Sequence, residues 1–230
     1  MKPKQLFKAR SFSLKTLNED YVIPVGKVYC VGRNYSDHAV EMNESIEKIE
    51  PFFFTKPPQS LTQNNKIPFP KNTNNLHHEV ELVVALHHGG TNISVDEAMS
   101  LVYAYGVGVD MTRRDLQAEA KQKSRPWEAG KTFRHAAPCA ALHKLSELGQ
   151  LNEASITLRI NGETRQTGDV NQMIWKVPEI ISRLSELFVL QPGDMIYTGT
   201  PAGVGPVLPG DQITAHIAGL SELAFKVSSS

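Results

Sequence analysis

Residues 74–90 read NNLHHEVELVVALHHGG, and the apolar run at residues 78–86 carries two acidic side chains, Glu79 and Glu81. The β-branched residues of this run predict a β-strand, on which successive side chains point to opposite faces. Glu79 and Glu81 therefore share one face with Val83, and the apolar residues between them occupy the other face. Burying two like charges side by side is costly unless a cation or a proton intervenes.

Two interpretations of this strand remain open at this point. A divalent cation held between the two carboxylates would remove the cost of burying them. An edge strand with a wet outer face would instead leave both glutamates solvated. A Glu-x-Glu pattern is a weak signal by itself, so the rest of the chain has to decide between these alternatives.

The chain has 230 residues, which is enough for one sizeable hydrophobic core and short for two, so one domain is expected. Basic and acidic residues balance at 24 each, and the sequence pI is near 7.1. This balance argues against nucleic acid or an acidic membrane surface as partner and favours a small neutral or anionic ligand.

The N-terminus MKPKQLFKARSFSLK lacks the apolar stretch of a secretory signal, and no apolar run approaches the length of a membrane span. Its basic, acid-free composition is shared with organellar transit peptides, but it is rich in Lys rather than Arg. A solvated arm at residues 1–24 and a cytoplasmic protein are therefore expected. Cys30 and Cys139 form no Cys-x-x-Cys pair, so both are predicted to be reduced, buried thiols.

Short β-patterned runs dominate the chain, and helical patterns are few. The helical patterns are SVDEAMSLVY at 94–103, TRRDLQAEAKQK at 112–123 and VPEIISRLSELF at 177–188. In the last of these, the apolar residues Ile180, Leu184, Leu187 and Phe188 are predicted to share one face. Two Pro-Gly-Asp sequences, at 192–194 and 209–211, predict tight turns that are each followed by a strand.

Asp110 is the best candidate for a third acidic ligand. It ends the apolar run YAYGVGVD and precedes a predicted helix, so capping that helix is an equally simple role for an isolated Asp. The balance shifts towards a site because Arg113 and Arg114 follow at once and Lys131 comes later in WEAGKTF. A basic cluster beside three acids suits the binding of a metal-chelated carboxylate.

A second group of polar residues lies in GRNYSDHAVEMN, where His38 and Glu41 are three positions apart. On a helical turn the two side chains meet, and the carboxylate would make the imidazole a competent base for water. Ordinary surface neighbours have the same spacing. The Gly-rich TGTPAGVGP contains Thr200 and predicts either a bend in a sheet or a cradle of backbone N–H groups for an anion.

An ordered set of motifs across residues 25–220 makes the chain resemble the fumarylacetoacetate hydrolase family, in particular its short acylpyruvate hydrolase and oxaloacetate decarboxylase branch. The matching stretches are GRNYSDHAVEM, PFFFTKP, HHEVELVV, GVGVDMTRRDLQ, RPWEAGKTF, INGETRQTGD and PEIISRLSELFVLQPGDMIYTGTPAGVGPVLPGDQI.

The resemblance implies an α+β, mainly β fold: a roll of mixed β-sheet with a few peripheral helices, covering residues 25–230 and assembled as a homodimer. It also implies Mg²⁺, with Mn²⁺ as an alternative, held by Glu79, Glu81 and Asp110.

The family further implies that His38 and Glu41 form a catalytic dyad and that Lys131 faces the reacting carbon skeleton. The substrate contacts that it implies are Arg33, Arg114, Gln117 and Thr200. Each of these positions carries the residue type that the motif requires.

These roles predict a metal-dependent enzyme that cleaves the C–C bond of acylpyruvates, of the 3-acylpyruvate or fumarylpyruvate type, to pyruvate and a carboxylate. Loss of CO₂ from oxaloacetate, or its tautomerisation, would use the same site without an attacking water, and isomerisation or decarboxylation in aromatic catabolism is a third alternative. A non-catalytic binding module is the alternative from another class, although such a module would need no base for water.

Overall fold

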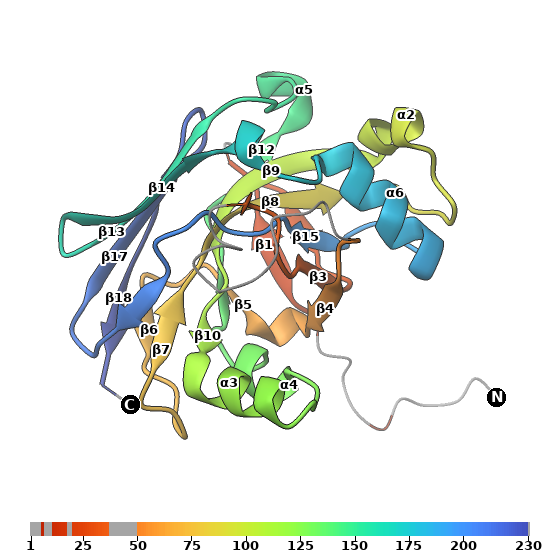
Figure 1. The fold of residues 1–230 in the computed structure, drawn as a ribbon. Coiled ribbons are helices and arrows are strands. Elements are labelled where there is room, and N and C mark those ends of the chain that lie inside the picture. The colour runs from red at the N-terminus through yellow and green to blue at the C-terminus, as the bar shows by residue number, and fades with distance from the viewer. Residues whose placement is uncertain (1–5, 7–10, 18–19, 37–49, 230) are drawn as a thin grey trace.

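The structure is a computed structural model that describes residues 6, 11–17, 20–36 and 50–229. Strands make up most of its regular structure, and the helices lie at the periphery (Figure 1). The sheets are mixed, with both parallel and antiparallel pairings. The predicted α+β, mainly β fold with a few peripheral helices is therefore confirmed.

A six-stranded sheet forms the centre of the molecule. Its strands, in spatial order, are β12 (His143–Lys144), β9 (Val102–Val109), β8 (Val80–Leu86), β15 (Met195–Tyr197), β3 (Val28–Val31) and β4 (Phe53–Lys56). All seven residues of β8 are buried, and β8 pairs with β9 on one side and with β15 on the other. The edge-strand alternative for this stretch is therefore wrong.

The two faces of β8 enter two different hydrophobic clusters, as the predicted alternation requires. Val80, Leu82 and Val84 belong to the larger cluster, which also contains the buried apolar residues of strands β13 (Ser155–Ile160), β17 (Gln212–Ile217) and β18 (Leu223–Ser228) and of helix α6 (Val177–Leu187). Val83 and Ala85 belong to a smaller cluster. Apolar contacts on both faces hold this strand, and with it the two glutamates, in a defined position.

The other strands form a five-stranded sheet, a three-stranded sheet and two pairs. The five-stranded sheet has the order β14 (Glu163–Asp169), β13 (Ser155–Ile160), β17 (Gln212–Ile217), β18 (Leu223–Ser228) and β6 (Lys66–Pro68). The three-stranded sheet has the order β10 (Thr112–Arg113), β7 (Leu76–His78) and β16 (Gly205–Val207). The pairs are β1 (Ser13–Lys15) with β2 (Val22–Pro24), and β5 (Leu61–Thr62) with β11 (Ala137–Pro138).

The helices are short. Those within the described residues are α2 (Val95–Ala98), α3 (Arg114–Gln122), α4 (Glu128–Lys131), α5 (Leu145–Leu148) and α6 (Val177–Leu187), with 3-10 turns η1 (Pro58–Ser60), η2 (Met99–Leu101) and η3 (Val170–Gln172). Ser94 caps α2 through a capping box with Glu97, as expected from the acidic first turn.

The prediction that four apolar residues of α6 share one face is only partly correct. Ile180 and Leu184 are fully buried, but Leu187 is 64% exposed. The helix ends at Leu187, and Phe188 is its C-cap with an extended backbone. Phe188 still packs against the larger hydrophobic cluster, so of the four predicted residues only Leu187 lies off the apolar face.

Both predicted Pro-Gly turns are present, before β15 and before β17. Gly193 and Gly210 adopt φ angles of 87° and 102°, which side chains of L-residues rarely adopt. The first turn aligns β15 beside both β3 and β8.

Residues before the expected boundary at 25 include the β1–β2 pair, and Leu14 of β1 is buried in the smaller hydrophobic cluster. The division into residues 1–24 and 25–230 stays a prediction. Cys30 and Cys139 are buried and free, as expected. Within the described residues, no helix is long and apolar enough to span a membrane.

Candidate active site

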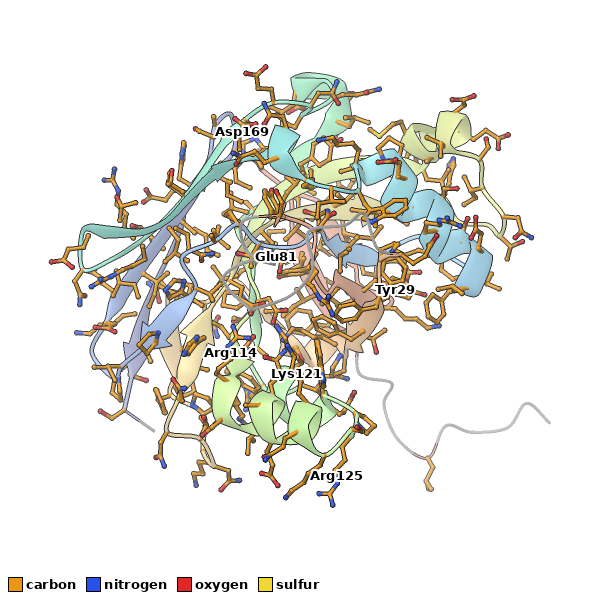
Figure 2. All side chains as sticks on the ribbon, viewed as in Figure 1. Tyr29, Glu81, Arg114, Lys121, Arg125 and Asp169 are labelled. Carbon is orange, nitrogen blue, oxygen red and sulfur yellow. The ribbon has the colours of Figure 1, made fainter. Side chains whose placement is uncertain are left out.

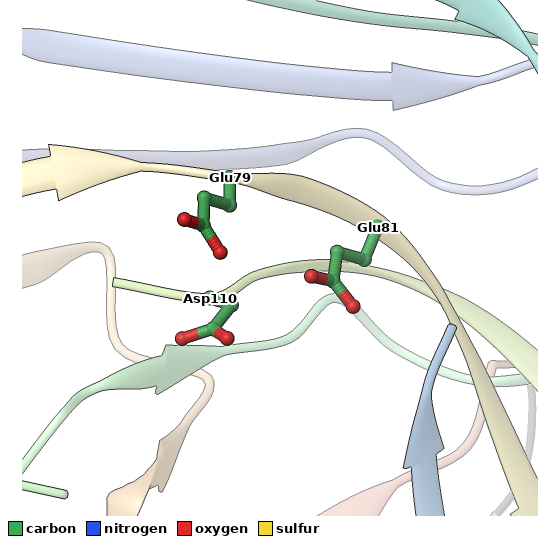
Figure 3. A group of neighbouring side chains, drawn as sticks. All are labelled: Glu79, Glu81 and Asp110. Carbon is green, nitrogen blue, oxygen red and sulfur yellow. The ribbon is translucent and has the colours of Figure 1, made fainter. Parts of the chain in front are cut away.

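Pairing between β8 and β9 brings the three acidic residues together. Val80 lies opposite Val109 and Glu81 opposite Gly108, so the next pair along the ladder is Glu79 and Asp110. The backbone N–H of Asp110 donates to the carbonyl oxygen of Glu79 at 2.7 Å. One oxygen from each of the three carboxylates lies within 4.8 Å of the others (Figure 3).

Lys131, at the end of α4, is a cation that bridges two of the three carboxylates. Its Nζ lies 2.7 Å from Glu79 Oε2 and 2.9 Å from Asp110 Oδ2, and it also donates to Thr112 Oγ1 at 2.7 Å. Burial acts to lower the pKa of Lys131, but the charges of Asp110 and Glu79 outweigh it, and the pKa is raised. Lys131 therefore stays protonated between the two carboxylates.

Arg114 occupies the other side of Glu79. Its Nη2 lies 2.5 Å from Glu79 Oε1, and its Nη1 donates to Gln117 Oε1 at 2.5 Å. The Nε of Arg114 donates to His77 Nδ1 at 3.3 Å. Because Arg114 begins helix α3 and Gln117 lies one turn later, the helix presents both side chains to the same region.

A second lysine, Lys56 at the end of β4, lies beside Asp110, and the sequence alone assigned it no role. It is 1% exposed, and its Nζ lies 2.8 Å from Asp110 Oδ1. It also donates to the carbonyl oxygens of Met111 and Lys131. Lys56 thus links the backbone after Asp110 to the end of α4, which positions both Asp110 and Lys131.

Glu81 is the carboxylate that most needs a cation. It is 2% exposed, and its Oε2 accepts from the backbone N–H of Gly199 at 2.8 Å. Burial, together with the charges of Asp110 and Glu79, raises its pKa well above the ordinary value for a glutamate. A divalent cation beside these three groups would favour the charged form of all three.

The donor set itself fits a hard divalent cation. All three candidate ligands offer carboxylate oxygens, which suit Mg²⁺ and Mn²⁺ better than zinc. Asp110 Oδ1 is buried and takes no hydrogen bond of acceptable geometry from the described residues, although Lys56 lies near it. A buried carboxylate oxygen that takes no hydrogen bond is a candidate ligand atom for a cation, which would share it with the Lys56 ammonium 2.8 Å away.

A pocket opens beside the carboxylates, and helix α3 forms one of its walls. Figure 2 shows Glu81 in the interior, with Arg114 and Lys121 on the side of α3. The predicted residues that line the pocket are Arg33, Glu79, Glu81, Arg114, Gln117, Lys131 and Thr200. Phe52, Phe54 and Trp127 add an aromatic wall, so charged groups and flat apolar surfaces face the same space.

Arg33 has a strained backbone at this pocket. Its φ is 110°, in the region that favours glycine, and its guanidinium lies 5.2 Å from the centre of the Phe52 ring. Such strain costs about 1–3 kcal/mol and persists where the surrounding structure imposes it, often at functional sites.

Eight of the ten predicted site residues are therefore described, and seven of these line one pocket, with Asp110 bonded to Lys131 at its base. The predicted dyad of His38 and Glu41 lies outside the described residues. Capping by Asp110 does not occur, because α3 begins later, with Arg113 as its N-cap, and the Asp110 carboxylate is directed to the two lysines.

Among the buried polar residues to which sequence reasoning assigned no role are Lys56 and Gln166. Both lie in strands, β4 and β14, where a buried Lys or Gln needs partners from elsewhere in the fold. A polar residue ending the apolar run PFFFTK is the one local signal that Lys56 offered.

Comparison with known proteins matches residues 27–228 to the family model "Fumarylacetoacetate (FAA) hydrolase C-terminal". A fumarylpyruvate hydrolase of Ralstonia sp is 42% identical over 187 residues, which is 81% of this chain and 96% of that protein. A mitochondrial oxaloacetate tautomerase of Homo sapiens is 40% identical over 201 residues, which is 87% of this chain and 90% of that protein.

Among solved structures, the fumarylpyruvate hydrolase from Pseudomonas aeruginosa in complex with Mn²⁺ and pyruvate superposes with a TM-score of 0.97 at 42% identity. The match covers 99% of this chain and 100% of that chain. Sequence and fold agree, and the chain belongs to the fumarylacetoacetate hydrolase family of enzymes.

Proposed function

We propose that the chain is a divalent-metal-dependent hydrolase that cleaves acylpyruvates, of the 3-acylpyruvate or fumarylpyruvate type, to pyruvate and a carboxylate. The observation that carries this proposal is the convergence of three buried carboxylates with Lys131 and Arg114 on one pocket. The fumarylpyruvate hydrolase of Ralstonia sp supports the same choice of substrate class.

Glu79, Glu81 and Asp110 would hold the cation, which we propose to be Mg²⁺ or Mn²⁺. When bound, the cation supplies Lewis-acid stabilisation of negative charge on the oxygens of a 2-oxo acid. The Mn²⁺ and pyruvate in the related Pseudomonas aeruginosa structure support this assignment.

The chain's own residues orient and stabilise the substrate. Arg114, Gln117 and Thr200 line the pocket and can donate to the substrate's oxygens. When the bond between C3 and C4 breaks, its electron pair passes into the pyruvate fragment as an enolate. The buried ammonium of Lys131 stabilises this developing charge in a site with little water.

The other carbon must receive a hydroxyl group from water. We propose that His38, assisted by Glu41, takes the proton from this water, as the family resemblance implies. A base of this kind typically contributes about 10²- to 10⁴-fold to the rate.

A second candidate function is decarboxylation or tautomerisation of oxaloacetate. It is favoured by the human oxaloacetate tautomerase, which is 40% identical to this chain. Loss of CO₂ from oxaloacetate leaves the same pyruvate enolate for Lys131 to stabilise, but it requires no attacking water.

The test measures pyruvate release from acetylpyruvate, fumarylpyruvate and oxaloacetate, each with Mg²⁺, with Mn²⁺ and with EDTA. Because tautomerisation releases no pyruvate, the ultraviolet absorbance of the oxaloacetate enol is followed as well. Release from an acylpyruvate that EDTA abolishes would support the hydrolase, and a much higher rate with oxaloacetate would favour the second candidate. Absence of turnover with all three substrates, together with absence of metal-dependent thermal stabilisation, would refute both and favour a binding module.

We further propose that the enzyme is cytoplasmic, as the composition of its N-terminus favours, and that it is a homodimer, as the family resemblance implies. Light scattering coupled to size-exclusion chromatography tests the oligomeric state, since one chain has a mass of 25.5 kDa. A monomeric mass at micromolar concentration would refute the dimer.

A further inference from the structure

Gln166 is a fully buried amide that connects the five-stranded sheet to the candidate active site. It lies on β14 and is 0% exposed. Its partners are His78 and Val80, on the strands just before and just after Glu79, and Thr200 and Pro201 in the loop after β15. Gln166 therefore joins two segments that line the same pocket.

Two backbone groups determine which way the amide of Gln166 points. The N–H of Val80 can only donate, and it lies 3.1 Å from Oε1. The carbonyl oxygen of Pro201 can only accept, and it lies 2.9 Å from Nε2. A flipped amide would place donor against donor and acceptor against acceptor, so the orientation follows from chemistry.

This orientation assigns the proton between Gln166 and Thr200. Gln166 Nε2 lies 2.8 Å from Thr200 Oγ1, and because the amide nitrogen only donates, the hydroxyl oxygen must accept. The hydrogen of the Thr200 hydroxyl is then available to another acceptor. Within the part of the chain that the structure describes, no hydrogen bond donated by this hydroxyl is found, and Thr200 lines the pocket.

We propose that Gln166 is a positioning residue that makes Thr200 a dedicated hydrogen-bond donor to an anionic oxygen of the bound 2-oxo acid. The inference rests on the proposed function, which supplies the anionic ligand. A carboxylate only accepts hydrogen bonds, so a hydroxyl that is already accepting from Gln166 offers it the complementary hydrogen. The same amide also anchors the strand of the two glutamates, through Val80, to the loop of Thr200.

The test uses the variant Gln166→Glu. The new side chain has the same shape and can still accept from Val80, but an ionised carboxylate cannot donate to Thr200. The Thr200 hydroxyl would then donate its hydrogen to this carboxylate, and its lone pairs would face the ligand. The probe is pyruvate binding to the Mn²⁺-loaded protein, measured by calorimetry, with Mn²⁺ affinity measured separately by electron paramagnetic resonance.

The matched variants are Thr200→Val, Thr200→Ser and Gln172→Glu. Thr200→Val removes the hydroxyl, and Thr200→Ser keeps it. Gln172 is exposed and accepts from the backbone N–H of Asp169 at 2.8 Å, so Gln172→Glu adds the same charge without removing a needed donor.

We expect Gln166→Glu and Thr200→Val each to weaken pyruvate binding about 10- to 100-fold, as expected for loss of a hydrogen bond to a charged group. Thr200→Ser and Gln172→Glu keep that hydrogen bond and should stay within about threefold of the unchanged protein. Mn²⁺ affinity should change less than about threefold in all variants, because none of them replaces a proposed ligand. Combining Gln166→Glu with Thr200→Val should weaken pyruvate binding no further than Thr200→Val alone.

If the losses of pyruvate affinity add in the double variant, the inference is overturned. Additive losses would mean that Gln166→Glu acts without the Thr200 hydroxyl, either by repelling pyruvate directly or by loosening the fold. Unchanged pyruvate binding in Gln166→Glu would also overturn it. If Gln166→Glu does not fold, Gln166→Met replaces it in the same set of variants. Gln166→Met should weaken pyruvate binding several-fold in the unchanged protein and should have no effect when Thr200 is already Val. Failure of the unchanged protein to bind pyruvate with Mn²⁺ would instead refute the proposed function, and the inference with it.

Discussion

Replacing Lys131 by Met should destabilise the metal-free protein and strengthen its binding of Mn²⁺. The ammonium of Lys131 is 2.7 Å from Glu79 and 2.9 Å from Asp110, and the residue is 3% exposed. In the metal-free protein Lys131 is the cation beside Glu79 Oε2 and Asp110 Oδ2, so Lys131→Met leaves both carboxylate oxygens buried without that cation.

Removing one partner of a buried ion pair typically costs about 3–5 kcal/mol. For a chain of this size each kcal/mol lowers Tm by about 2–4 °C, so the metal-free Tm should fall by about 6–20 °C. Mn²⁺ has to compete with the Lys131 ammonium for the same carboxylates, and its dissociation constant should fall at least about tenfold without it, a gain of about 1.4 kcal/mol. The rise in Tm on adding Mn²⁺ should therefore be larger in Lys131→Met than in the unchanged protein.

The assay is differential scanning fluorimetry of EDTA-treated protein, with and without Mn²⁺, together with paramagnetic resonance of free Mn²⁺. Lys123→Met is the matched control, because Lys123 forms an exposed pair with Glu119 at 2.5 Å, and such pairs add little to stability. An unchanged metal-free Tm in Lys131→Met, or a Mn²⁺-induced rise no larger than that of the unchanged protein, would refute the reasoning.

Four further predictions concern the fold and the site. Burial acts to raise the pKa of Asp115, but hydrogen bonds from Thr73 and from the backbone of Asn74 and Leu116 outweigh it, and the pKa is lowered. A lowered pKa means that the carboxylate adds stability above its unfolded pKa of about 3.9 and loses it as the pH falls through the lower folded value. Asp115→Asn should thus lower Tm by about 1–4 °C at pH 7, and the difference should shrink as the pH falls through the lowered folded pKa; a difference in Tm that does not vary with pH would contradict this. Gly199→Ala should lower the free energy of unfolding by about 2 kcal/mol or more, because φ is 100° and the new Cβ would lie 2.6 Å from Asn34 Cβ. In the control Gly162→Ala the new Cβ meets nothing within 4 Å, so only the positive φ should cost stability, by about 1 kcal/mol. Equal losses in Tm would argue against the clash. Glu81→Gln should weaken Mg²⁺ and Mn²⁺ binding at least about tenfold in a calorimetric titration, and unchanged affinity would exclude Glu81 as a ligand. His38→Ala should reduce acylpyruvate cleavage about 10²- to 10⁴-fold in the pyruvate-release assay while sparing oxaloacetate decarboxylation, and equal loss of both would remove the proposed division of roles.

The paired glutamates were predictable because side-chain direction on a strand follows from a local period of two residues. HEVELVVAL therefore indicated the shared face of Glu79 and Glu81 before any partner was known, and β8 has the two-sided burial that this alternation requires. The turns before β15 and β17 were predictable for a similar reason, since Pro and Gly restrict the backbone within a few residues.

Resemblance to a family went further than these local rules and predicted seven residues that line one pocket. It did not assign Lys56 or Gln166, whose roles depend on partners distant in the sequence. Lys56 meets Asp110 across 54 positions, and Gln166 meets His78 across 88. The sequence near either residue contains nothing that specifies those partners.

What the sequence alone determined is which side chains share a face, where turns occur and which residue types are available for a metal and an anionic substrate. What the tertiary structure decided is which strands lie next to each other. Because β8 lies between β9 and β15, the two glutamates are buried, whereas on an edge strand they would have been exposed to water. The physical reason is that backbone geometry acts over a few residues, whereas strand order is set by how the whole chain buries its apolar surface and satisfies its buried polar groups.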